Sequence, residues 1–378
     1  MKPVIRPLPA APSYGATDLA GVLPSAAASL GVKGFRGALP QARGAVVVLV
    51  DGLGAELLRA RSGHAPFMRT LMIDAASATA GFPSTTATSM GTFGTGLPPG
   101  SHGLLGYQVV DPATDLLFNE LSWENGPDPR RWQREPTVFE RVAAAGIETT
   151  MVANDYFDGS GLTTAALRGA GFATAATLAQ RVDIVLARVA RQPRSLTYIY
   201  WGNLDRTGHE FGCGSWEWVD ELEAVDAELQ RLSTRLPRGV SLTITADHGM
   251  IDIPESNKTD IAFDPELAAG VRHTGGEMRS LQLYCEPGAT DDVLAAWTAR
   301  LGEQGWVLPM ADAVSRGLFG PVQPHIAPRL GDVLVAMDGP YGYWDSRVMT
   351  TKVGELTGQH GSLTAAEMAV PVLHRPAD

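Results

Sequence analysis

Six side chains of this sequence are suited to binding metal ions, and they form four separate signals along the chain. They are Asp51, the pair Asp205 and His209, the pair Asp247 and His248, and His360. Three carboxylates and three histidines are the donor set that suits a pair of Zn²⁺-like ions. Such ion pairs clamp a phosphoryl group during in-line displacement. No signal is specific alone, so the prediction of a dinuclear metal site rests on the whole set.

Each pair also has a simpler interpretation. Asp205 and His209 lie four positions apart, so on a helix they share one face and could reach one ion, but the same spacing is typical of a surface pair. Asp247 and His248 are adjacent, and adjacent strand residues point to opposite faces. Both can reach one site only if the strand ends there, and Gly249 supplies such a break.

A hydroxyl-rich segment at residues 81–92 has the sequence Gly-Phe-Pro-Ser-Thr-Thr-Ala-Thr-Ser-Met-Gly-Thr. A threonine at a helix N-terminus is ordinarily a cap, and this is the role that we expect of Thr85. Next to metal ions the same geometry suits a nucleophile, because the helix end and a cation both stabilise an alkoxide and receive a phosphate.

Strands and helices alternate in the segments that must position these residues. Residues 45–50 are all apolar and mostly β-branched, which predicts a strand buried on both faces that ends at Asp51. Further strands are predicted at 148–153, 196–200 and 240–245, with helices at 24–30, 55–61, 138–145 and 218–236. This order predicts an α/β fold with a mostly parallel central sheet covered by helices on both faces. Sites in such sheets form beyond the carboxyl ends of the strands, where Asp51 and Asp247 fall.

Composition divides the chain into three parts. Residues 1–43 are rich in Pro and Ala and predict a lead-in that lies over the core. Residues 44–254 and 356–378 are predicted to form the α/β metallohydrolase core. Residues 255–355 predict a small α+β insertion, with strands at 280–285 and 331–337 and a helix at 291–304. We expect this cap-like insertion to build one wall of the pocket, and not to be an independent domain, because the chain must return to the core to deliver His360.

Charge and hydropathy restrict the partners. A net charge of −11 in 378 residues disfavours a nucleic-acid polymer, because phosphate tracking needs clustered Lys and Arg. A small phosphate ester remains suitable, because two divalent cations would dominate the local field. No apolar run approaches the roughly 20 residues of a membrane span, and prolines interrupt the N-terminal segment where a signal peptide would be apolar. We therefore expect a cytoplasmic location, no membrane partner and reduced Cys213 and Cys285; the sequence does not indicate an oligomeric state.

The order of the motifs resembles the alkaline phosphatase superfamily, and within it the nucleotide pyrophosphatase/phosphodiesterase branch. The resemblance is carried by Asp51, by Phe-Pro-Ser-Thr-Thr at 82–86, by Thr-Gly-Leu-Pro-Pro-Gly-Ser-His-Gly at 95–103 and by the later metal-ligand signals. It covers residues 44–110, residues 195–250 and the segment around His360. The superfamily fold agrees with the α/β fold that the alternation predicts.

This resemblance implies two divalent metal ions, expected to be Zn²⁺, and a threonine nucleophile. One ion would be held by Asp205, His209 and His360, and the other by Asp51, Asp247, His248 and the nucleophile. The family's spacing back from Thr95 places that nucleophile on Thr86, with Thr85 as the alternative. Where the phosphodiesterase branch usually carries an asparagine that holds a phosphate oxygen, this sequence has Tyr107, whose hydroxyl can donate one hydrogen bond. Tyr107 is therefore our candidate substrate-binding residue.

The implied activity is hydrolysis of phosphodiester or pyrophosphate bonds of small molecules through a phospho-threonine intermediate. A phosphomonoesterase or phosphonate hydrolase of the same superfamily is the first alternative, but it needs extra cations for a dianionic group, and no arginine follows Thr86 closely. A sugar-phosphate mutase would release no net phosphate. A non-catalytic phosphate-binding module is expected to lack a metal ligand, and none is missing. Four other histidines, His64, His273, His325 and His374, have no partner at ligand spacing, and for each we expect a place in solvent or in the core. His273 is the first exception to consider, because Gly275 and Gly276 beside it could let a loop come close to the substrate.

Overall fold

The computed structural model describes residues 8–15, 17–74 and 76–377. Its centre is a seven-stranded sheet in the order β2-β17-β8-β1-β7-β5-β6. The strands are β1 (Gly44–Val50), β2 (Ala76–Thr79), β5 (Glu148–Ala153), β6 (Gly171–Thr174), β7 (Ser195–Trp201), β8 (Val240–Thr245) and β17 (Ala369–Arg375). From β8 to β6 the neighbours run parallel, whereas β17 is antiparallel to both β8 and β2. The predicted α/β fold with a mostly parallel sheet is confirmed.

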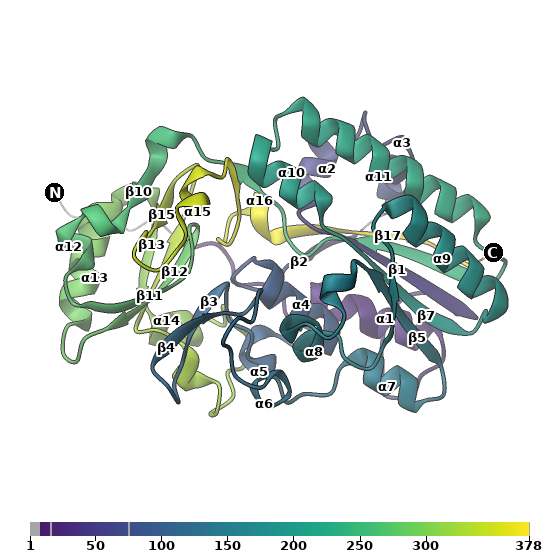
Figure 1. Cartoon of the computed structure of the whole chain (residues 1–378), viewed down its shortest axis with the longest axis horizontal. Coiled ribbons are helices and arrows are strands. Elements are labelled where there is room, and N and C mark those ends of the chain that lie inside the picture. Colours follow the sequence, from purple (N-terminus) through teal and green to yellow (C-terminus); the bar gives the residue numbers. More distant parts are fainter. Residues whose placement is uncertain (1–7, 16, 75, 378) are drawn as a thin grey trace.

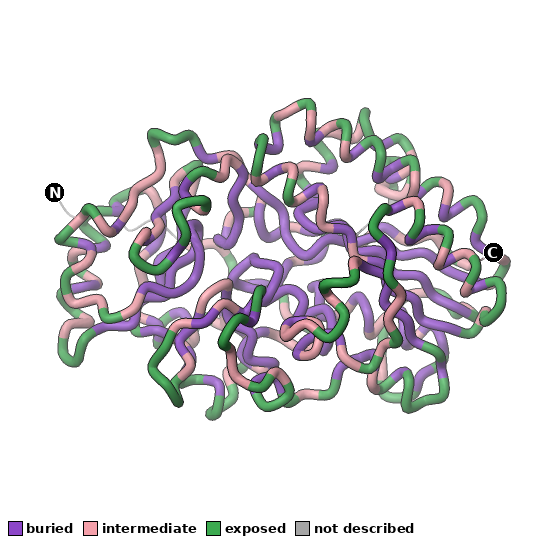
Figure 2. The backbone as a smooth tube through the Cα atoms, in the orientation of Figure 1, coloured by how far each residue is buried: buried purple, intermediate pink, exposed green. Residues whose placement is uncertain are grey.

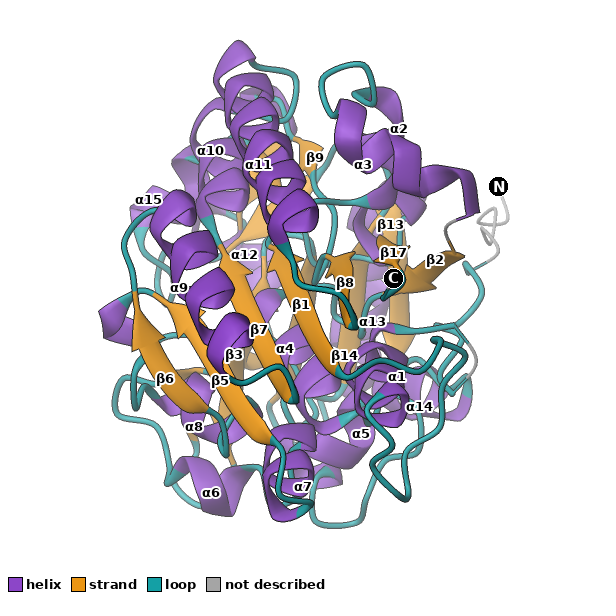
Figure 3. Ribbon diagram, turned by 90° about the vertical axis from the view of Figure 1, so that its right-hand side faces the viewer, coloured by secondary structure: helices purple, strands orange, loops and turns teal. Residues whose placement is uncertain are grey.

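Helices cover both faces of this sheet (Figures 1 and 3). One face carries α2 (Ala55–Ala60), α3 (Pro66–Leu71), α9 (Leu178–Arg191), α10 (Asn203–Phe211) and α11 (Trp216–Arg235). The other carries α1 (Val22–Ser29), α4 (Thr86–Thr95), α7 (Val138–Ala144) and α8 (Gly161–Ala166). Helix α11 begins before the predicted residue 218 because the Ser215 hydroxyl caps it, accepting a hydrogen bond from the Trp218 amide.

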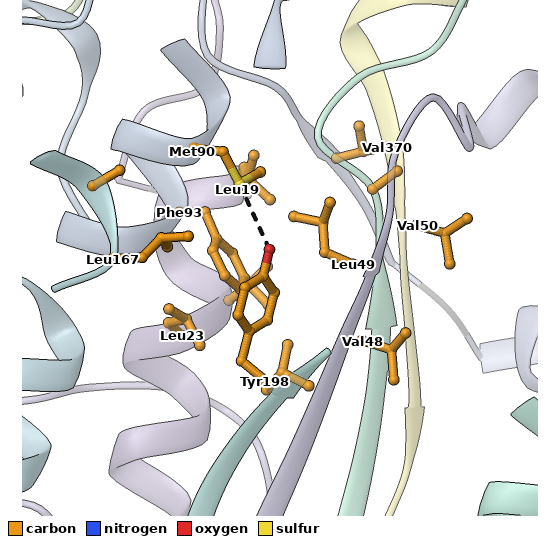
Figure 4. Packing of buried hydrophobic residues seen from close by; sticks show 14 of the residues in the cluster. Leu19, Leu23, Val48, Leu49, Val50, Met90, Phe93, Leu167, Tyr198 and Val370 are labelled. Atoms are coloured by element: carbon orange, nitrogen blue, oxygen red, sulfur yellow. Dashed lines mark hydrogen bonds between the residues drawn. The ribbon is translucent and has the colours of Figure 1, made fainter. Parts of the chain in front are cut away.

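The central strands are apolar on both faces because both faces are covered. Every residue of β1 is buried, as is every residue of β8, and Figure 2 shows the sheet as the most continuously buried part of the chain. Figure 4 shows the packing between the sheet and α4, where the Tyr198 hydroxyl lies 3.6 Å from the Met90 sulfur. The Phe93 ring lies 5.1 Å from that of Tyr198. This packing fixes the helix whose first residue is Thr86.

A second sheet lies beside the first and contains four antiparallel strands in the order β11-β12-β14-β13 (Figure 1). They are β11 (Val271–Glu277), β12 (Ser280–Cys285), β13 (Gly305–Pro309) and β14 (Val333–Met337), accompanied by α12 (Pro265–Ala268), α13 (Thr290–Leu301) and α14 (Met310–Ser315). Along β14, Val333 and Val335 pack into a second hydrophobic cluster, while Leu334 and Ala336 pack into the main core. This shared packing supports the proposal that residues 255–355 are an insertion in the core.

Short elements complete the described fold. They are β3 (Gln108–Asp111), β4 (Leu116–Asn119), β9 (Ile251–Asp252), β10 (Lys258–Asp260), β15 (Gly342–Trp344), β16 (Gly358–Gln359), α5 (Pro99–His102), α6 (Pro129–Trp132), α15 (Thr351–Glu355) and α16 (Ala365–Met368). The β3–β4 and β9–β16 pairs are antiparallel, and the β10–β15 pair is parallel. Strand β9 precedes the insertion and β16 follows it, so their pairing brings the two ends of the insertion together.

Within the described residues, no helix combines the length and the apolar character needed to cross a membrane. Cys213 and Cys285 are both buried and form no disulfide, as predicted.

Candidate active site

Three adjacent parallel strands place the three predicted carboxylates at one edge of the sheet. Asp51 directly follows β1, Asp247 follows β8, and Asp205 lies in the first turn of α10, which begins shortly after β7. His209 lies one turn further along α10, and its Nε2 is 3.3 Å from Asp205 Oδ2. The helical spacing therefore puts both side chains on one face, as the sequence predicted.

His360 reaches the same place through β16, which pairs with β9 just beyond His248. The rings of His248 and His360 stack with centroids 3.6 Å apart, and the centroid of His209 lies 5.1 Å from that of His360. The structure thus brings all six predicted metal-binding side chains together.

These side chains form two groups that could hold an ion. Ligand atoms of Asp51, Asp247 and His248 all lie within 4.8 Å of one another, and so do those of Asp205, His248 and His360. The first group matches the set that the resemblance implies. The second group contains His248 in place of the expected His209. His209 lies next to this group, because its Nε2 is close to the Asp205 carboxylate. His248 therefore lies between the two positions.

In each carboxylate one oxygen has no hydrogen-bond partner among the residues that the structure describes. Asp247 Oδ1 accepts hydrogen bonds from the amides of Gly52, at 3.1 Å, and His248, at 3.0 Å. Asp51 Oδ2 accepts one from the Tyr200 hydroxyl. Among the described residues none donates a hydrogen bond to Asp51 Oδ1, Asp205 Oδ1 or Asp247 Oδ2, although all three atoms are buried. Buried unpaired carboxylate oxygens are costly, and a bound cation removes that cost.

The three imidazoles are oriented by backbone carbonyl groups. The Nδ1 atoms lie 2.7 Å from Gly358 O for His209, 3.0 Å from Gly249 O for His248 and 2.9 Å from Ser84 O for His360. An Nδ1–H that donates to a carbonyl leaves the Nε2 lone pair available for a metal ion. The Nε2 atom of His248 lies 3.4 Å from Asp51 Oδ1 and 3.4 Å from Asp247 Oδ2. Free carboxylate oxygens and imidazole lone pairs therefore face the same space.

The electrostatics of the site also fit bound cations. Burial raises the pKa of Asp205 and of Asp247 to about 7. Burial, with the Asp247 carboxylate next, raises the pKa of Asp51 well above its usual value. Burial lowers the pKa of His248, and it lowers that of His360 well below its usual value. Burial thus opposes charge on these carboxyl and imidazole groups, and bound divalent ions would favour the ionised carboxylates and neutral imidazoles that ligate metals, so the residues fit a pair of such ions.

Position 52 must be a glycine because the backbone of Asp205 lies very close to it. Its φ is +73°, and a Cβ atom there would lie 3.0 Å from the Cα atom of Asp205. A side chain at this position would strain the backbone and push Asp205 away from Asp51.

Thr86 is the first residue of α4, and its hydroxyl lies 3.2 Å from His248 Nε2. Thr85 stands at the N-cap, but in the described part of the chain its side chain makes no capping hydrogen bond. Its hydroxyl instead hydrogen-bonds the carboxyl group of Glu277. The expectation that Thr85 caps the helix is therefore wrong, and its hydroxyl is bonded to the Glu277 carboxyl group instead.

A cavity of about 650 Å³ opens over Thr85 and Thr86. The insertion and the segment leading back from it supply much of its wall, including Glu277, Met278, Met349, Lys352 and Val353. Tyr107 also lines the cavity, and it hydrogen-bonds the Asn119 side chain. Burial raises the pKa of Tyr107, so its hydroxyl remains a donor. Substrate contact by Tyr107 stays a prediction.

Two neighbours of the site were not predicted from the sequence. The first is Glu277, which lines the cavity. His273, by contrast, pairs with Asp115 at 3.3 Å and is not among the residues that line the cavity. The Gly275–Gly276 signal did mark a close approach, but the side chain that it brings is Glu277. The second is Tyr200, whose hydroxyl donates a hydrogen bond to Asp51. The pairing of β7 with β1 places Tyr200 there, and nothing in its sequence context indicated that role.

Comparison with known proteins identifies the family. The family model described as type I phosphodiesterase / nucleotide pyrophosphatase matches residues 45–363. An uncharacterized pyrophosphatase/phosphodiesterase of Schizosaccharomyces pombe is 26% identical over 226 residues, which are 54% of this chain and 44% of that protein. Venom phosphodiesterase 2 of Crotalus adamanteus is 27% identical over 205 residues, which are 50% of this chain and 23% of the venom protein. The chain thus spans less than half the length of these curated relatives.

Solved structures share the fold. Murine ectonucleotide pyrophosphatase / phosphodiesterase 5, as an inactive variant in complex with AMP, matches with a TM-score of 0.71 at 18% identity, covering 88% of each chain. Phosphonoacetate hydrolase from Sinorhizobium meliloti, in complex with phosphonoacetate, matches with a TM-score of 0.69 at 20% identity, covering 91% of this chain and 92% of that one. The family match over most of its length shows that this chain belongs to the type I phosphodiesterase / nucleotide pyrophosphatase family.

Proposed function

We propose that this protein is a dinuclear-metal hydrolase that cleaves phosphodiester or pyrophosphate bonds of small phosphate esters through a phospho-threonine on Thr86. The observation that carries the proposal is the set of buried, unpartnered carboxylate oxygens that face imidazole Nε2 atoms beside the Thr86 hydroxyl. Two divalent ions, with Zn²⁺ as the candidate, would neutralise phosphoryl charge and lower the pKa of the hydroxyl and of the attacking water.

The residues divide between the two sides of an in-line displacement. Thr86 Oγ1 loses its proton to solvent and forms the new bond to phosphorus on the side of Asp51 and Asp247. Backbone amides at the N-terminus of α4 receive a non-bridging oxygen. The bond to the leaving oxygen breaks on the opposite side, near Asp205 and His360, and that oxygen takes a proton from solvent. Water then hydrolyses the phospho-threonine and regenerates the Thr86 hydroxyl.

Charges around the cavity favour diesters over dianionic substrates. A phosphomonoester or a carboxylate-bearing phosphonate carries a second negative charge that needs a fixed cation. Among the described residues that line the cavity, the basic side chains are Arg206 and Lys352, and both are exposed. Exposed cations are weakened by solvent screening. Because a phosphonate hydrolase shares the fold, phosphonates are nonetheless the second substrate class to test.

The experiment compares metal-depleted and Zn²⁺-loaded protein on bis(4-nitrophenyl) phosphate, 4-nitrophenyl phosphate and phosphonoacetate. We expect chelation to abolish turnover, Zn²⁺ to restore it, and kcat/KM for the diester to exceed that for the monoester by at least about tenfold, the equivalent of one charged hydrogen bond. Full activity without metal would exclude the mechanism. Faster turnover of the monoester or of phosphonoacetate would move the chain to another substrate class.

A further inference from the structure

One buried carboxyl group of the insertion lies in the wall of the active-site cavity. Glu277 ends β11 at the tip of the β11–β12 hairpin, is 9% exposed and lines the cavity. Its Oε2 lies 3.6 Å from His360 Nδ1, and the Thr85 hydroxyl hydrogen-bonds its carboxyl group. Its Oε1 is also buried and accepts no hydrogen bond from any residue that the structure describes. A buried acceptor without a donor, in the wall of a substrate cavity, is suited to receive one from the substrate.

The hairpin tip that carries Glu277 is held rigidly. Arg279, two residues further on, donates to Glu367 Oε1 at 3.0 Å and to Glu367 Oε2 at 2.8 Å, and both side chains are fully buried. On the other side, Gly361 has φ +130°, and a Cβ atom there would lie 2.8 Å from the Glu277 carboxyl carbon. The tip is therefore packed against the residue that follows His360. Glu277 is in this way fixed beside the reacting centre.

Glu277 lies on the side where the leaving group departs in the proposed mechanism. Its neighbours there are His360, at 3.6 Å, and the Asp205 carboxylate, which interacts with it electrostatically. The other charged residues of the cavity wall, apart from the six predicted metal ligands, are exposed, and their charges balance: Arg206, Glu210, Lys352 and Glu355. Apart from the predicted metal ligands, Glu277 is thus the buried carboxyl group among the described residues that line the cavity.

We propose that Glu277 selects the leaving group by accepting a hydrogen bond from a hydroxyl or amino group on it, so that the substrates are phosphodiesters of polar alcohols. This inference rests on the proposed function and narrows it. An alcohol with a neighbouring hydroxyl or amino group supplies the donor that Oε1 lacks. The leaving group of a pyrophosphate is a phosphate, whose oxygens are acceptors and leave Oε1 without a donor.

The test uses two diesters that share a methyl phosphate portion and differ in one atom of the leaving alcohol. Methyl 2-hydroxyethyl phosphate releases ethylene glycol, and methyl propyl phosphate releases propanol; in both, methyl phosphate is the product measured. We expect wild-type kcat/KM to favour the hydroxyethyl ester by about tenfold or more, because the propyl ester leaves the buried Oε1 without a donor. In Glu277→Ala the ratio should fall to within about threefold of unity. Glu277→Gln, whose amide oxygen still accepts, should give an intermediate ratio.

Controls separate substrate contact from other roles. Glu266→Gln alters an exposed carboxyl group in the same insertion and should keep the wild-type ratio. In a Thr86→Ala background, which cannot turn over, calorimetry should show the same loss of preference in Kd when Glu277 becomes Ala.

Three results would overturn the proposal: an unchanged preference in Glu277→Ala, faster wild-type hydrolysis of methyl diphosphate than of either diester, or loss of bound metal from Glu277→Gln, which would make Glu277 a support for His360. A metal-loaded wild type that hydrolyses neither the diesters nor the diphosphate would instead reject the proposed function itself.

Discussion

Thr85 and Thr86 are neighbours in the sequence with different hydrogen-bond partners. The Thr86 hydroxyl faces His248 Nε2, within the set of potential metal ligands, whereas the Thr85 hydroxyl faces the carboxyl group of Glu277. Successive residues of a forming helix differ by about 100° in direction, so only one of the two can point at the metal positions. Geometry therefore supports Thr86 as the nucleophile.

Replacing Thr86 separates the two threonines experimentally. Thr86→Ala should lower kcat by about 10³-fold or more, because the group that forms the bond to phosphorus is removed. Thr86→Ser keeps a hydroxyl and should retain measurable turnover. Thr85→Ala should cost no more than about tenfold, the value of one ordinary hydrogen bond. Steady-state kinetics on bis(4-nitrophenyl) phosphate compares the three variants at equal metal content.

Chemical trapping then identifies the modified residue. A slowly hydrolysed diester, quenched in acid during turnover, should leave phosphate on the peptide that contains Thr86. Phosphate on Thr85, or on neither threonine, would show that the assignment is wrong.

At this scale the sequence identified residues whose chemistry is marked by a local motif. Asp205 and His209 share a helical spacing, and Asp247 and His248 stand before a glycine that ends a strand. Glu277 has no such mark, because its role depends on the packing of a hairpin tip against Gly361, far away in the sequence. The paired glycines indicated the close approach, but sequence spacing could not show which neighbouring side chain would enter the cavity.

At the scale of elements, the site depends on three parallel strands that end side by side. β8, β1 and β7 are adjacent in the sheet, so the residues after them converge although they are far apart in the sequence. The sequence located these strands because each is a short run rich in apolar, aromatic and β-branched residues. It did not locate β17, which contains Pro371; proline lacks an amide hydrogen, and strands that contain it are hard to recognise. In the sheet Pro371 pairs only with β2, and pairing with β8 begins at Val372.

Different elements should hold the two metal ions separately. Asp205 is carried by α10 and Asp247 by the end of β8, and each has a buried oxygen that no described residue satisfies. We expect Asp205→Ala and Asp247→Ala each to retain about one ion where the wild type retains two, because each lacks one of the ligands that its ion requires. Elemental analysis of dialysed protein measures the ratio. Asp220→Ala, an exposed carboxylate on α11, should retain both ions. Loss of both ions from either site variant would contradict separate positions.

For the whole molecule, the insertion and the core are joined through packing that both share. β14 faces the second hydrophobic cluster with one side and the main core with the other. The sequence predicted the insertion because the chain must return to the core for His360. It could not predict the buried ion pair that fastens the insertion, since Arg279 and Glu367 lie 88 positions apart. Glu367 also accepts hydrogen bonds from the Ser362 amide, at 3.0 Å, and the Thr364 hydroxyl, at 2.5 Å. The same carboxylate therefore holds both the insertion and the turn after His360.

Breaking this ion pair should destabilise the molecule and loosen the site together. Arg279→Met leaves the Glu367 carboxylate buried without its cation, and the cost of an uncompensated buried charge is about 3–5 kcal/mol. Arg300→Met provides the control, because Arg300 pairs with Asp264 in the same insertion with its side chain 46% exposed, and an exposed pair contributes about 1 kcal/mol or less. Urea denaturation followed by tryptophan fluorescence should show this difference in the free energy of unfolding. Because Glu367 anchors the segment after His360, Arg279→Met should also weaken metal retention, whereas Arg300→Met should not. Equal stability of the two variants would mean that the insertion is held by its apolar contacts alone.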